Sequence, residues 1–472
     1  MNKSWLFDQV EQDRERLLDL ALQIWETPEL GLHEHESSQI LIEALREEGF
    51  DVRTGVSDMP TAFVASYGEG SPKIGILGEY DALPELSQKV TTEREPVEEG
   101  KPGHGCGHNL FGVGSLGGAV AVKRAIERDE LEGTIAYYGC PAEENADGKT
   151  FMARDGVFDD LEAALAWHPA SISKPDWRPT LAMDSVKFTF EGISAHAAGA
   201  PESGRSALDA VQLMNTGVEN MREHVSNEAR IHYAITEGGT APNVVPAEAT
   251  VWYYVRAPTR DEVDRISSWV TDVAEGAAKM TQTTVDRNLM TGISEYLPNE
   301  TVTEVIWENM QAVGPIEYTD EDRAFAAELQ ETVPAKTIES QVEDAPEEIR
   351  AEVRERALCS EPVKADSGAG ELHYGSTDVA DVSWNTATGQ FRAAALPIGV
   401  SGHSWQAVSM YGGPGRKSVN FVAKVLAGSA YDLMTDSTTI DEAWEEFERE
   451  TDGQPYDSPL PKDATPPFDL TE

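Results

Sequence analysis

Residues 103–121, GHGCGHNLFGVGSLGGAVA, decide the fold of this chain. A glycine-rich turn opens the stretch, and a helix rich in glycine and alanine is expected over about 110–127. This helix lies between two continuous apolar runs, at 74–77 and 134–138, which have the composition of buried strands. Buried strands that alternate with helices are typical of a three-layer α/β/α domain with a largely parallel sheet.

The same pattern extends outward on both sides of this unit. Two helices are expected within 5–50, and further strands at 63–65 and 163–167. Near residue 184 the pattern changes, because SVKFTFE at 185–191 alternates like a half-buried strand. The elements that follow come in the order β-α-β-β-α-β and predict a small inserted α+β domain of ferredoxin-like type. Their expected ranges are 185–191, 205–224, 231–235, 250–256, 261–280 and about 283–293.

We therefore expect a main domain that is interrupted once. Its first part occupies 1–183, the inserted domain occupies 184–298, and its second part occupies 299–472. A helix at about 299–314 marks the return to the main domain.

The second part contains two stretches of unusual composition. Residues 317–362 are dense in Glu and Asp, with weak apolar periodicity until a helix near 346–357, and predict an acidic surface insertion. Residues 453–472 are rich in Pro and Asp and predict an extended tail.

Net charge is the outlier in the composition. The chain has 472 residues, and 84 acidic against 37 basic side chains give a formal charge of −47. The scarce basic residues, 14 Lys and 23 Arg, argue against a partner that is nucleic acid or an anionic membrane. Such charge opposes a compact fold by self-repulsion in dilute buffer, and it keeps a protein soluble where salt screens it. We hypothesise adaptation to a salt-rich cytoplasm; an ordinary acidic protein is the alternative.

Cysteine use and hydropathy predict a cytoplasmic protein. Cys106, Cys140 and Cys359 make no disulfide framework. The start, MNKSWLFDQVEQDRERLL, goes directly into charged residues and lacks the apolar core of a signal peptide. No stretch approaches about 18 uninterrupted apolar residues, so no membrane span is expected.

Five short motifs carry side chains that bind metals. Each has a structural alternative: a turn with a buried Cys, a solvated acidic loop, a structural His, or an acidic turn at a strand end. Together they supply a thiol, imidazoles and paired carboxylates at the ends of consecutive strands, which is the donor set of a binuclear divalent site. The motifs are HGCGHN (104–109), PAEEN (141–145), WHP (167–169), SGHSW (401–405) and ILGEYDALP (76–84).

These motifs carry a family resemblance. The chain resembles the M20 metallopeptidase and amidohydrolase family, in the branch with a Cys in place of the usual bridging Asp, and within it the p-aminobenzoyl-glutamate hydrolases of B type. The Gly-Cys-Gly-His and Glu-Glu strings, in that order, are the specific part of the match. The matching strings run in family order over about 28–410 and are PELGLHE (28–34), LGEYDALPELSQ (77–88), GHGCGHNLFGVGSLGGAVA (103–121), GCPAEEN (139–145), AWHP (166–169), SAHAAGAPESGRSALDAV (194–211), APNVVPAEATVWYYVRAP (241–258), GSTDVADVSW (375–384) and SGHSWQ (401–406).

The resemblance implies a catalytic domain, an inserted lid that serves for dimerisation, and two divalent metal ions, Mn or Zn. Glu143 matches the general base that activates the attacking water. Asp81 matches an Asp that, in related branches, orients a His ligand two residues before it. That earlier position is Glu79 here, which leaves the role of Asp81 open. The residues that match the metal ligands are Cys106, His108, Glu144, His168 and His403.

Three further matches lie in the lid. His196 matches a His that reaches into the other protomer's site and stabilises the oxyanion; the alternative is a surface His beside a strand. Asn243 and Arg256 match positions associated with the substrate carboxylate, which the Arg fork suits; a plain strand salt bridge is the alternative. No chemistry is assigned to three polar residues in or beside the matched strings: His373, Asp378 and Asp381.

The predicted activity is hydrolysis of a small amide. The resemblance implies an N-acyl or N-aroyl amino acid substrate such as p-aminobenzoyl-glutamate, cleaved by a two-metal activated water with Glu143 as base. A metallodipeptidase or an N-acyl-amino-acid deacylase of the same fold is one alternative, and a non-catalytic partner or binding protein is another. The lid predicts a homodimer, and a hetero-oligomer with a homologous partner is the other assembly that the resemblance allows.

Overall fold

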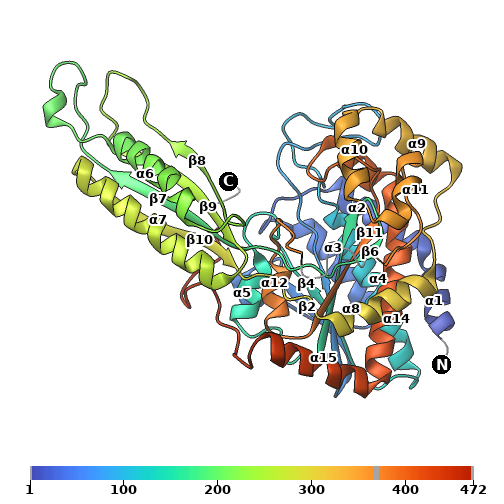
Figure 1. The fold of residues 1–472 in the computed structure, drawn as a ribbon. Coiled ribbons are helices and arrows are strands. Elements are labelled where there is room, and N and C mark those ends of the chain that lie inside the picture. Colours follow the sequence, from blue (N-terminus) through green and yellow to red (C-terminus); the bar gives the residue numbers. More distant parts are fainter. Residues whose placement is uncertain (1–2, 365–370, 469–472) are drawn as a thin grey trace.

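The central element of the structure is a seven-stranded sheet with the order β1-β2-β4-β3-β5-β11-β6 (Figure 1). The computed structural model describes residues 3–364 and 371–468. Strands β4, β3, β5 and β11 are parallel neighbours, and antiparallel strands extend the sheet at both edges. The prediction of a largely parallel sheet therefore holds for its centre. The strands are β1 (Asp51–Thr54), β2 (Phe63–Glu69), β3 (Lys73–Gly78), β4 (Gly133–Gly139), β5 (Ala163–Ala170), β6 (Lys174–Pro175) and β11 (Thr388–Ala394).

Two successive tyrosines of β4 reveal what covers the two faces of this sheet. The Tyr137 hydroxyl donates to the Gly112 carbonyl in α4 (His108–Glu127), 3.1 Å away. Tyr138 packs on Phe158, which follows α5 (Gly148–Arg154), with ring centroids 5.0 Å apart. Because successive side chains of a strand point to opposite faces, both faces are covered, and the predicted three-layer α/β/α fold is confirmed.

Helix α4 is the helix predicted from the opening glycine-rich stretch. A Cβ atom at Gly117 would lie 2.8 Å from Cβ of Ala423, and one at Gly118 would lie 2.8 Å from Cβ of Leu426. Both neighbours belong to α14 (Ser418–Thr435), so the glycines let two helices pack closely on the sheet. The remaining helices around this sheet are α1 (Lys3–Gln12), α2 (Arg14–Glu26), α3 (His35–Glu47), α8 (Glu300–Val313), α12 (Val379–Ser383), α13 (Trp405–Gly412) and α15 (Ser437–Glu450).

Two regions contain more helix than the sequence pattern predicts. The N-terminal region has three helices where two are expected, because α1 and α2 are separated only at Asp13. The acidic stretch 317–362 forms α9 (Asp320–Gln330), α10 (Ala335–Asp344) and α11 (Arg350–Glu355). Helix α11 lies within the range predicted for a helix, 346–357, whereas α9 and α10 are not predicted. Each of these helices buries at most two residues, such as Ala326 and Leu329 in α9, which leaves the apolar periodicity weak.

The predicted tail has an irregular course after α15. Leu460 is buried, and the Tyr456 hydroxyl donates to Oδ1 of Asp381, 2.7 Å away. Residues 469–472 of the predicted tail lie outside the described residues. Within the described chain, no helix has both the length and the apolarity needed to cross a membrane.

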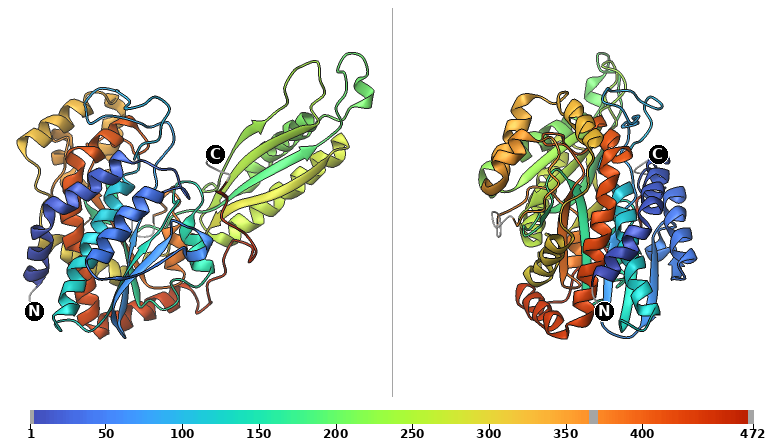
Figure 2. Two further views of the ribbon diagram at one scale, coloured as in Figure 1. Left: turned by 180° about the vertical axis from the view of Figure 1, so that it is seen from behind. Right: turned by 90° about the vertical axis from the view of Figure 1, so that its right-hand side faces the viewer.

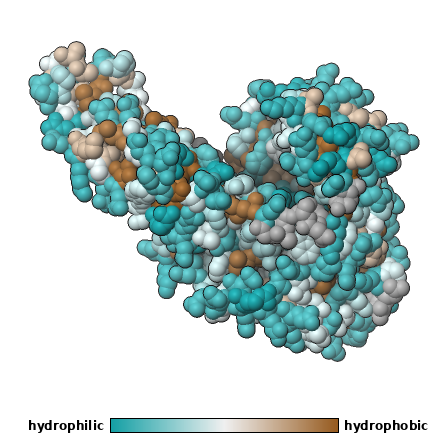
Figure 3. Space-filling view, in the orientation of Figure 1, coloured by the Kyte–Doolittle hydropathy of each residue, from teal (hydrophilic) through white to brown (hydrophobic). Residues whose placement is uncertain are grey.

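The inserted lid has its own sheet and its own core. Its four antiparallel strands have the order β10-β7-β9-β8, and its two long helices pack on that sheet. Phe188, Val251 and Val270 belong to a buried cluster that is separate from the core of the main domain. The lid projects away from the main domain in Figure 1 and in the left view of Figure 2, and Figure 3 shows a hollow between the two. Its elements are β7 (Ala182–Glu191), α6 (Ala207–Met221), β8 (Arg230–Glu237), β9 (Glu248–Ala257), α7 (Arg260–Thr281) and β10 (Thr284–Ile293).

The lid has a near end and a far end. Met183 pairs with Arg256 where the chain enters from the main domain, and Glu191 pairs with Glu248 at the other end of the same two strands. Eight residues of strand span about 26 Å. The loops at 192–206 and 238–247 therefore lie at the far end, at the tip of the projecting lobe in Figure 1.

Candidate metal centre

The predicted ligands converge at the carboxyl ends of the central strands. His168 lies near the end of β5, and Glu144 follows β4. Cys106 and His108 stand at the N-terminal end of α4, and His403 precedes α13. Four separate stretches of sequence thus meet at the sheet edge where open α/β folds place their ligands.

The five side chains form two groups that share Cys106. The ligand atoms of Cys106, His108 and His168 lie within 4.8 Å of one another, with Sγ of Cys106 3.2 Å from Nε2 of His168. The ligand atoms of Cys106, Glu144 and His403 lie equally close, with Nε2 of His403 3.3 Å from Oε1 of Glu144. Two neighbouring cations with one common ligand would need this arrangement.

Two buried atoms of the cluster lack a hydrogen-bond partner. Among the described residues, Nε2 of His108 lies 3.2 Å from Oε2 of Glu79, and Oε1 of Glu144 lies 3.3 Å from Nε2 of His403, both without hydrogen-bond geometry. Burial and the Glu144 charge raise the pKa of the Cys106 thiol well above its ordinary value. Orphaned buried acceptors are costly unless something satisfies them. A sulfur, nitrogen and oxygen donor set with orphaned atoms fits divalent metal ions.

Asp81 holds two of the predicted ligands in place. Its Oδ1 lies 2.6 Å from Nδ1 of His108, and its Oδ2 accepts from the backbone N–H of Glu144 at 2.9 Å. Burial alone would raise the pKa of Asp81, but the charge and hydrogen bond of His108 outweigh it and lower that pKa. The His that Asp81 contacts is therefore 27 positions later in the chain, not two positions earlier as in the related branches. With Nδ1 engaged, Nε2 of His108 is the nitrogen left for a cation.

Glu143 lies beside the ligands. One of its carboxylate oxygens is 3.9 Å from Nε2 of His108, and its side chain is 13% exposed. Burial, followed by the charges of Glu79 and Glu144, raises the pKa of Glu143 well above its ordinary value. A partly exposed carboxylate at the edge of a cation site can exchange protons with water.

Two residues in the left-handed region shape the loops that carry these groups. Ala142, just before Glu143, has a φ of 61°, and His403 has a φ of 57°. Oε1 of Glu34 accepts from the Ala142 N–H at 2.7 Å, and the Gly105 carbonyl accepts from the His403 N–H at 2.8 Å. Such backbone costs of order 1–3 kcal/mol per residue and persists only where surrounding contacts fix it, most often at functional sites.

A buried cation that the sequence analysis does not single out balances the carboxylates. Nζ of Lys149 lies 2.6 Å from Oε1 of Glu79 and 2.7 Å from Oδ1 of Asp378. These three side chains are at most 1% exposed. Oε2 of Glu79 in turn lies 3.2 Å from Nε2 of His108, so Lys149 joins the metal cluster through one residue. In the sequence, Lys149 is a single Lys among apolar and small residues, five positions after Glu144, and this pattern by itself does not identify it.

The lid residues stay apart from this cluster. His196 and Asn243 lie together at the far end, where the Ala197 N–H donates to the Asn243 carbonyl at 3.0 Å. Arg256 lies at the near end, and its Nε donates to the sulfur of Met183 at 3.2 Å. The two lid positions associated with the substrate carboxylate are therefore separated by most of the length of the lid sheet.

His196 is presented in one tautomer. Its side chain is exposed, and Nδ1 accepts from the N–H groups of Ala198 and Gly199 at 3.2 and 3.0 Å. An Nδ1 that accepts hydrogen bonds carries no proton, which leaves Nε2–H as a donor.

The other two cysteines lie outside the cluster. Cys140 is buried, with Sγ 3.4 Å from the Tyr138 carbonyl, and burial raises its pKa to about 12. Cys359 packs in a small apolar cluster with Val342 and Val353 of the acidic insertion. Neither sulfur belongs to a group that could hold a metal within the described chain.

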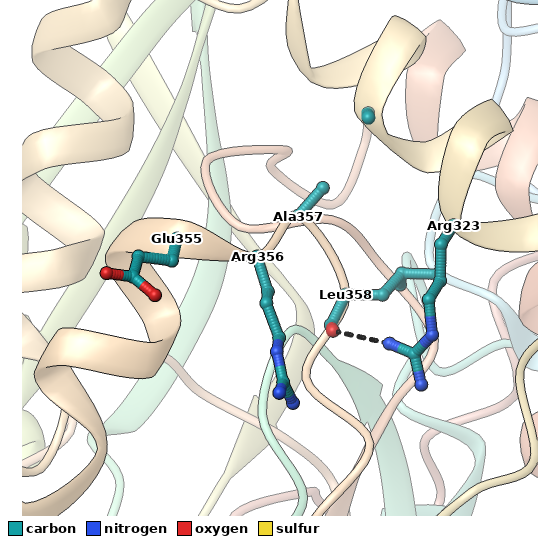
Figure 4. Close-up of a pocket in the computed structure, with 6 residues that line it drawn as sticks. Arg323, Glu355, Arg356, Ala357 and Leu358 are labelled. Carbon is teal, nitrogen blue, oxygen red and sulfur yellow. Dashed lines mark hydrogen bonds between the residues drawn. The ribbon is translucent and has the colours of Figure 1, made fainter. Parts of the chain in front are cut away.

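A separate pocket lies in the acidic insertion (Figure 4). Arg323 of α9 donates to the Leu358 carbonyl across it at 3.3 Å, and Glu355 and Arg356 lie on its other side. Its lining includes no predicted site residue, and it carries no chemistry that the metal cluster needs.

Comparisons with known proteins show what the whole chain is similar to. Residues 182–281 match a family described as a peptidase dimerisation domain, named M20_dimer. The chain is 41% identical over 473 residues to the B component of the p-aminobenzoyl-glutamate hydrolase of Escherichia coli, covering 97% of each chain. It is 29% identical to human Xaa-Arg dipeptidase, over 66% of this chain and 72% of the relative. A solved Bacillus subtilis dinuclear metal binding peptidase from the M20 family superposes with a TM-score of 0.58 at 18% identity, covering 90% of this chain and 99% of that one. An aminobenzoyl-glutamate utilization protein from Klebsiella pneumoniae does so with a TM-score of 0.58 at 18% identity, over 88% and 98%.

Proposed function

The chain belongs to the M20 metallopeptidase family, and we propose that it is a two-metal amidohydrolase of small N-acyl and N-aroyl amino acids. Family membership makes it a metal-dependent hydrolase of amide bonds. We favour p-aminobenzoyl-glutamate as the substrate, because a relative that matches nearly the whole chain is named for that compound.

The observation that carries the proposal is the pair of donor groups that share Cys106, with Glu143 at their edge. Cys106, His108 and His168 would hold one divalent ion, and Cys106, Glu144 and His403 would hold the second. Such ions polarise an amide carbonyl and make a bound water acidic. Thiolate and imidazole suit zinc, whereas carboxylate and water also suit manganese.

The protein's own groups move the protons. Glu143 takes a proton from the attacking water and gives it to the amine that leaves. Asp81 keeps His108 oriented, because it accepts from the nitrogen that faces away from the cluster. Lys149 keeps a positive charge next to Glu79. This charge offsets part of the repulsion among the carboxylates around Glu143.

The far end of the lid would serve a second copy of the chain. His196 and Asn243 lie at the tip of the lid, whereas the metal donors lie in the main domain, so we propose that both residues complete the site of the other protomer. There the Nε2–H of His196 would donate to the oxyanion. The lid exposes large apolar side chains, among them Ile193 at 55%, Tyr233 at 40%, Ile235 at 45% and Val244 at 40%. Figure 3 shows apolar surface on this lobe. We propose a two-fold dimer through the lid, residues 184–298.

A pocket beside His403 suits an aromatic acyl group. It has a volume of about 230 Å³, and Leu86, Pro96 and Trp405 supply apolar walls. Arg94 and Glu99 also line it. Because His403 belongs to one donor group, an acyl group in this pocket would have its carbonyl next to the metal centre.

A substrate panel with metal analysis tests the proposed activity. Purified protein is loaded with Mn or Zn and assayed at high salt with p-aminobenzoyl-glutamate, other acyl amino acids and dipeptides. We expect about two ions per chain and the highest kcat/KM for the aroyl-glutamate. Higher activity on dipeptides would favour the dipeptidase alternative, and no hydrolysis by a metal-loaded protein would contradict the proposal.

Mixing two inactive variants tests the shared site. Glu143→Gln disables the main-domain side, and His196→Ala disables the lid side. If His196 acts on the other protomer, dimers that contain one chain of each kind have one intact site, and activity returns on mixing. Failure of mixed dimers to recover any activity would place His196 in its own chain's site.

A further inference from the structure

A row of side chains leads away from the metal centre across three neighbouring strands. His168 of β5 lies opposite Arg392 of β11, and Arg392 lies opposite Lys174 of β6. Neighbouring strands are about 4.8 Å apart, so the backbone of Lys174 lies about 10 Å from that of His168. Arg178 follows on the segment that enters the lid at Ala182. The row thus lies between the metal centre and the entrance to the lid.

Most donors of these three cations are unused within the described part of the chain. Nε of Arg392 donates to Oδ2 of Asp176 at 2.8 Å, and Nε of Arg178 lies 3.8 Å from the other oxygen of that carboxylate. The side chain of Lys174 makes no hydrogen bond or ion pair with any described residue, although its backbone pairs with that of Arg392. The terminal guanidinium nitrogens of Arg392 and Arg178 are likewise unpaired among these residues. Three cations therefore share one buried carboxylate.

The local charge opposes the charge of the whole molecule. Among the described residues, three cations minus one carboxylate leave +2 here, in a chain of −47. The side chains of Arg392 and Arg178 are only 21% and 26% exposed, so solvent screens them incompletely. Burial and the Arg178 charge lower the pKa of Lys174 to about 8. The neighbouring His373 adds no charge near pH 7, because burial and Arg392 lower its pKa to about 4. An anion would relieve this repulsion.

We propose that Lys174, Arg178 and Arg392 form a subsite for the side-chain carboxylate of the substrate's amino acid. The subsite rests on the proposed amide hydrolysis at the adjacent metal centre, and it selects glutamate as the acidic amino acid. Arginine forks bind both oxygens of a carboxylate, and Lys174 adds a point charge. This subsite is separate from Arg256 and Asn243 of the lid, so a dicarboxylate substrate would meet a cation at each end.

A pair of isosteric substrates tests the subsite. The kcat/KM is measured for p-aminobenzoyl-glutamate and p-aminobenzoyl-glutamine with the metal-loaded dimer and with Lys174→Met and Arg178→Gln. Each variant is expected to lower kcat/KM for the glutamate about 10- to 100-fold and to change that for the glutamine less than about 2-fold. Lys364→Met is the matched control, because Lys364 already pairs with Glu304 at 2.7 Å, and it should leave both values unchanged.

Equal losses on both substrates would overturn the subsite and make the cluster structural, and so would no loss on either. If the wild-type protein hydrolyses neither substrate, the proposed function fails, and calorimetry then tests the subsite by itself. Glutarate should bind the metal-free wild-type protein about 10-fold more tightly than it binds Lys174→Met. Equal affinities would overturn the subsite whatever reaction the metal centre performs.

Discussion

Carboxylates occupy two opposite environments in this molecule. At the ends of β3 and β4, Glu79 and Glu143 are enclosed beside one another, and burial raises the pKa of both. In the acidic insertion, 317–362, carboxylates such as Glu331, which follows α9, are exposed. The interior group depends on cations held by the protein, whereas the surface group depends on cations in the solvent. The formal charge of −47 therefore has a buried part and a surface part, and different cations balance the two.

Replacing the carboxylate that we assign as the base should have the largest effect. Glu143→Gln keeps the shape and removes the proton acceptor, so kcat should fall by about 10²- to 10⁴-fold while the bound metal stays. Steady-state assays with metal analysis measure both. Glu331→Gln, the same change on the insertion, should leave kcat within about 2-fold. Near-normal turnover of Glu143→Gln would refute the base assignment.

Removing the buried counter-charge should destabilise the fold. Lys149→Met leaves Glu79 and Asp378 buried without their cation, which should lower the free energy of unfolding by about 3–5 kcal/mol. Denaturant unfolding measures this. Lys336→Met removes an exposed cation from the acidic insertion and should change the same quantity by less than about 0.5 kcal/mol. Equal losses of unfolding free energy in Lys149→Met and Lys336→Met would show that the buried and the exposed carboxylates do not differ in their need for a cation.

Disturbing the orienting carboxylate should weaken metal binding. Asp81→Asn preserves size but loses the charge that faces Nδ1 of His108, so metal affinity should drop about 10- to 100-fold. Competition with a chelator gives the affinity. The fold should remain, as judged by circular dichroism. Unchanged affinity would mean that Asp81 only buttresses the loop at Glu144.

Added salt should stabilise the protein through its exposed carboxylates and not through the buried ones. Molar KCl screens the exposed carboxylates and should raise the Tm by at least about 5 °C over dilute buffer. Lys149→Met should gain as much as the wild-type protein and stay equally far below it, because its defect is buried. No rise of the wild-type Tm would remove the case for adaptation to salt. Rescue of Lys149→Met by KCl would show that its site is open to solvent.

The sequence predicts the candidate metal ligands better than it predicts the residues that hold these ligands in place. Cys106, His168 and His403 stand in short glycine- or proline-flanked motifs, and His168 lies near the end of a strand, where an α/β sheet gathers its ligands. Lys149 has no such motif, because a single Lys in a helix is ordinary until the fold buries it against Glu79. The contact between Asp81 and His108 also depends on how α4 meets the sheet, which no local pattern encodes.

The same contrast holds for the fold. The α/β order of the main domain and the β-α-β-β-α-β order of the lid follow from the apolar runs along the chain. Helices α9 and α10 within 317–362 escape prediction, because each buries too few residues to produce a strong period. The span of the lid sheet, which separates Asn243 from Arg256, becomes visible only when the strand register is known.

Metal content after loss of one thiol tests the central claim most directly. Wild-type protein, Cys106→Ser and Cys140→Ser are loaded with Zn or Mn, dialysed and analysed for bound ions. If Cys106 is shared by two ions, the wild-type protein and Cys140→Ser should each retain about two ions per chain, and Cys106→Ser should lose both or bind them far more weakly. Full retention of two ions by Cys106→Ser would contradict the account.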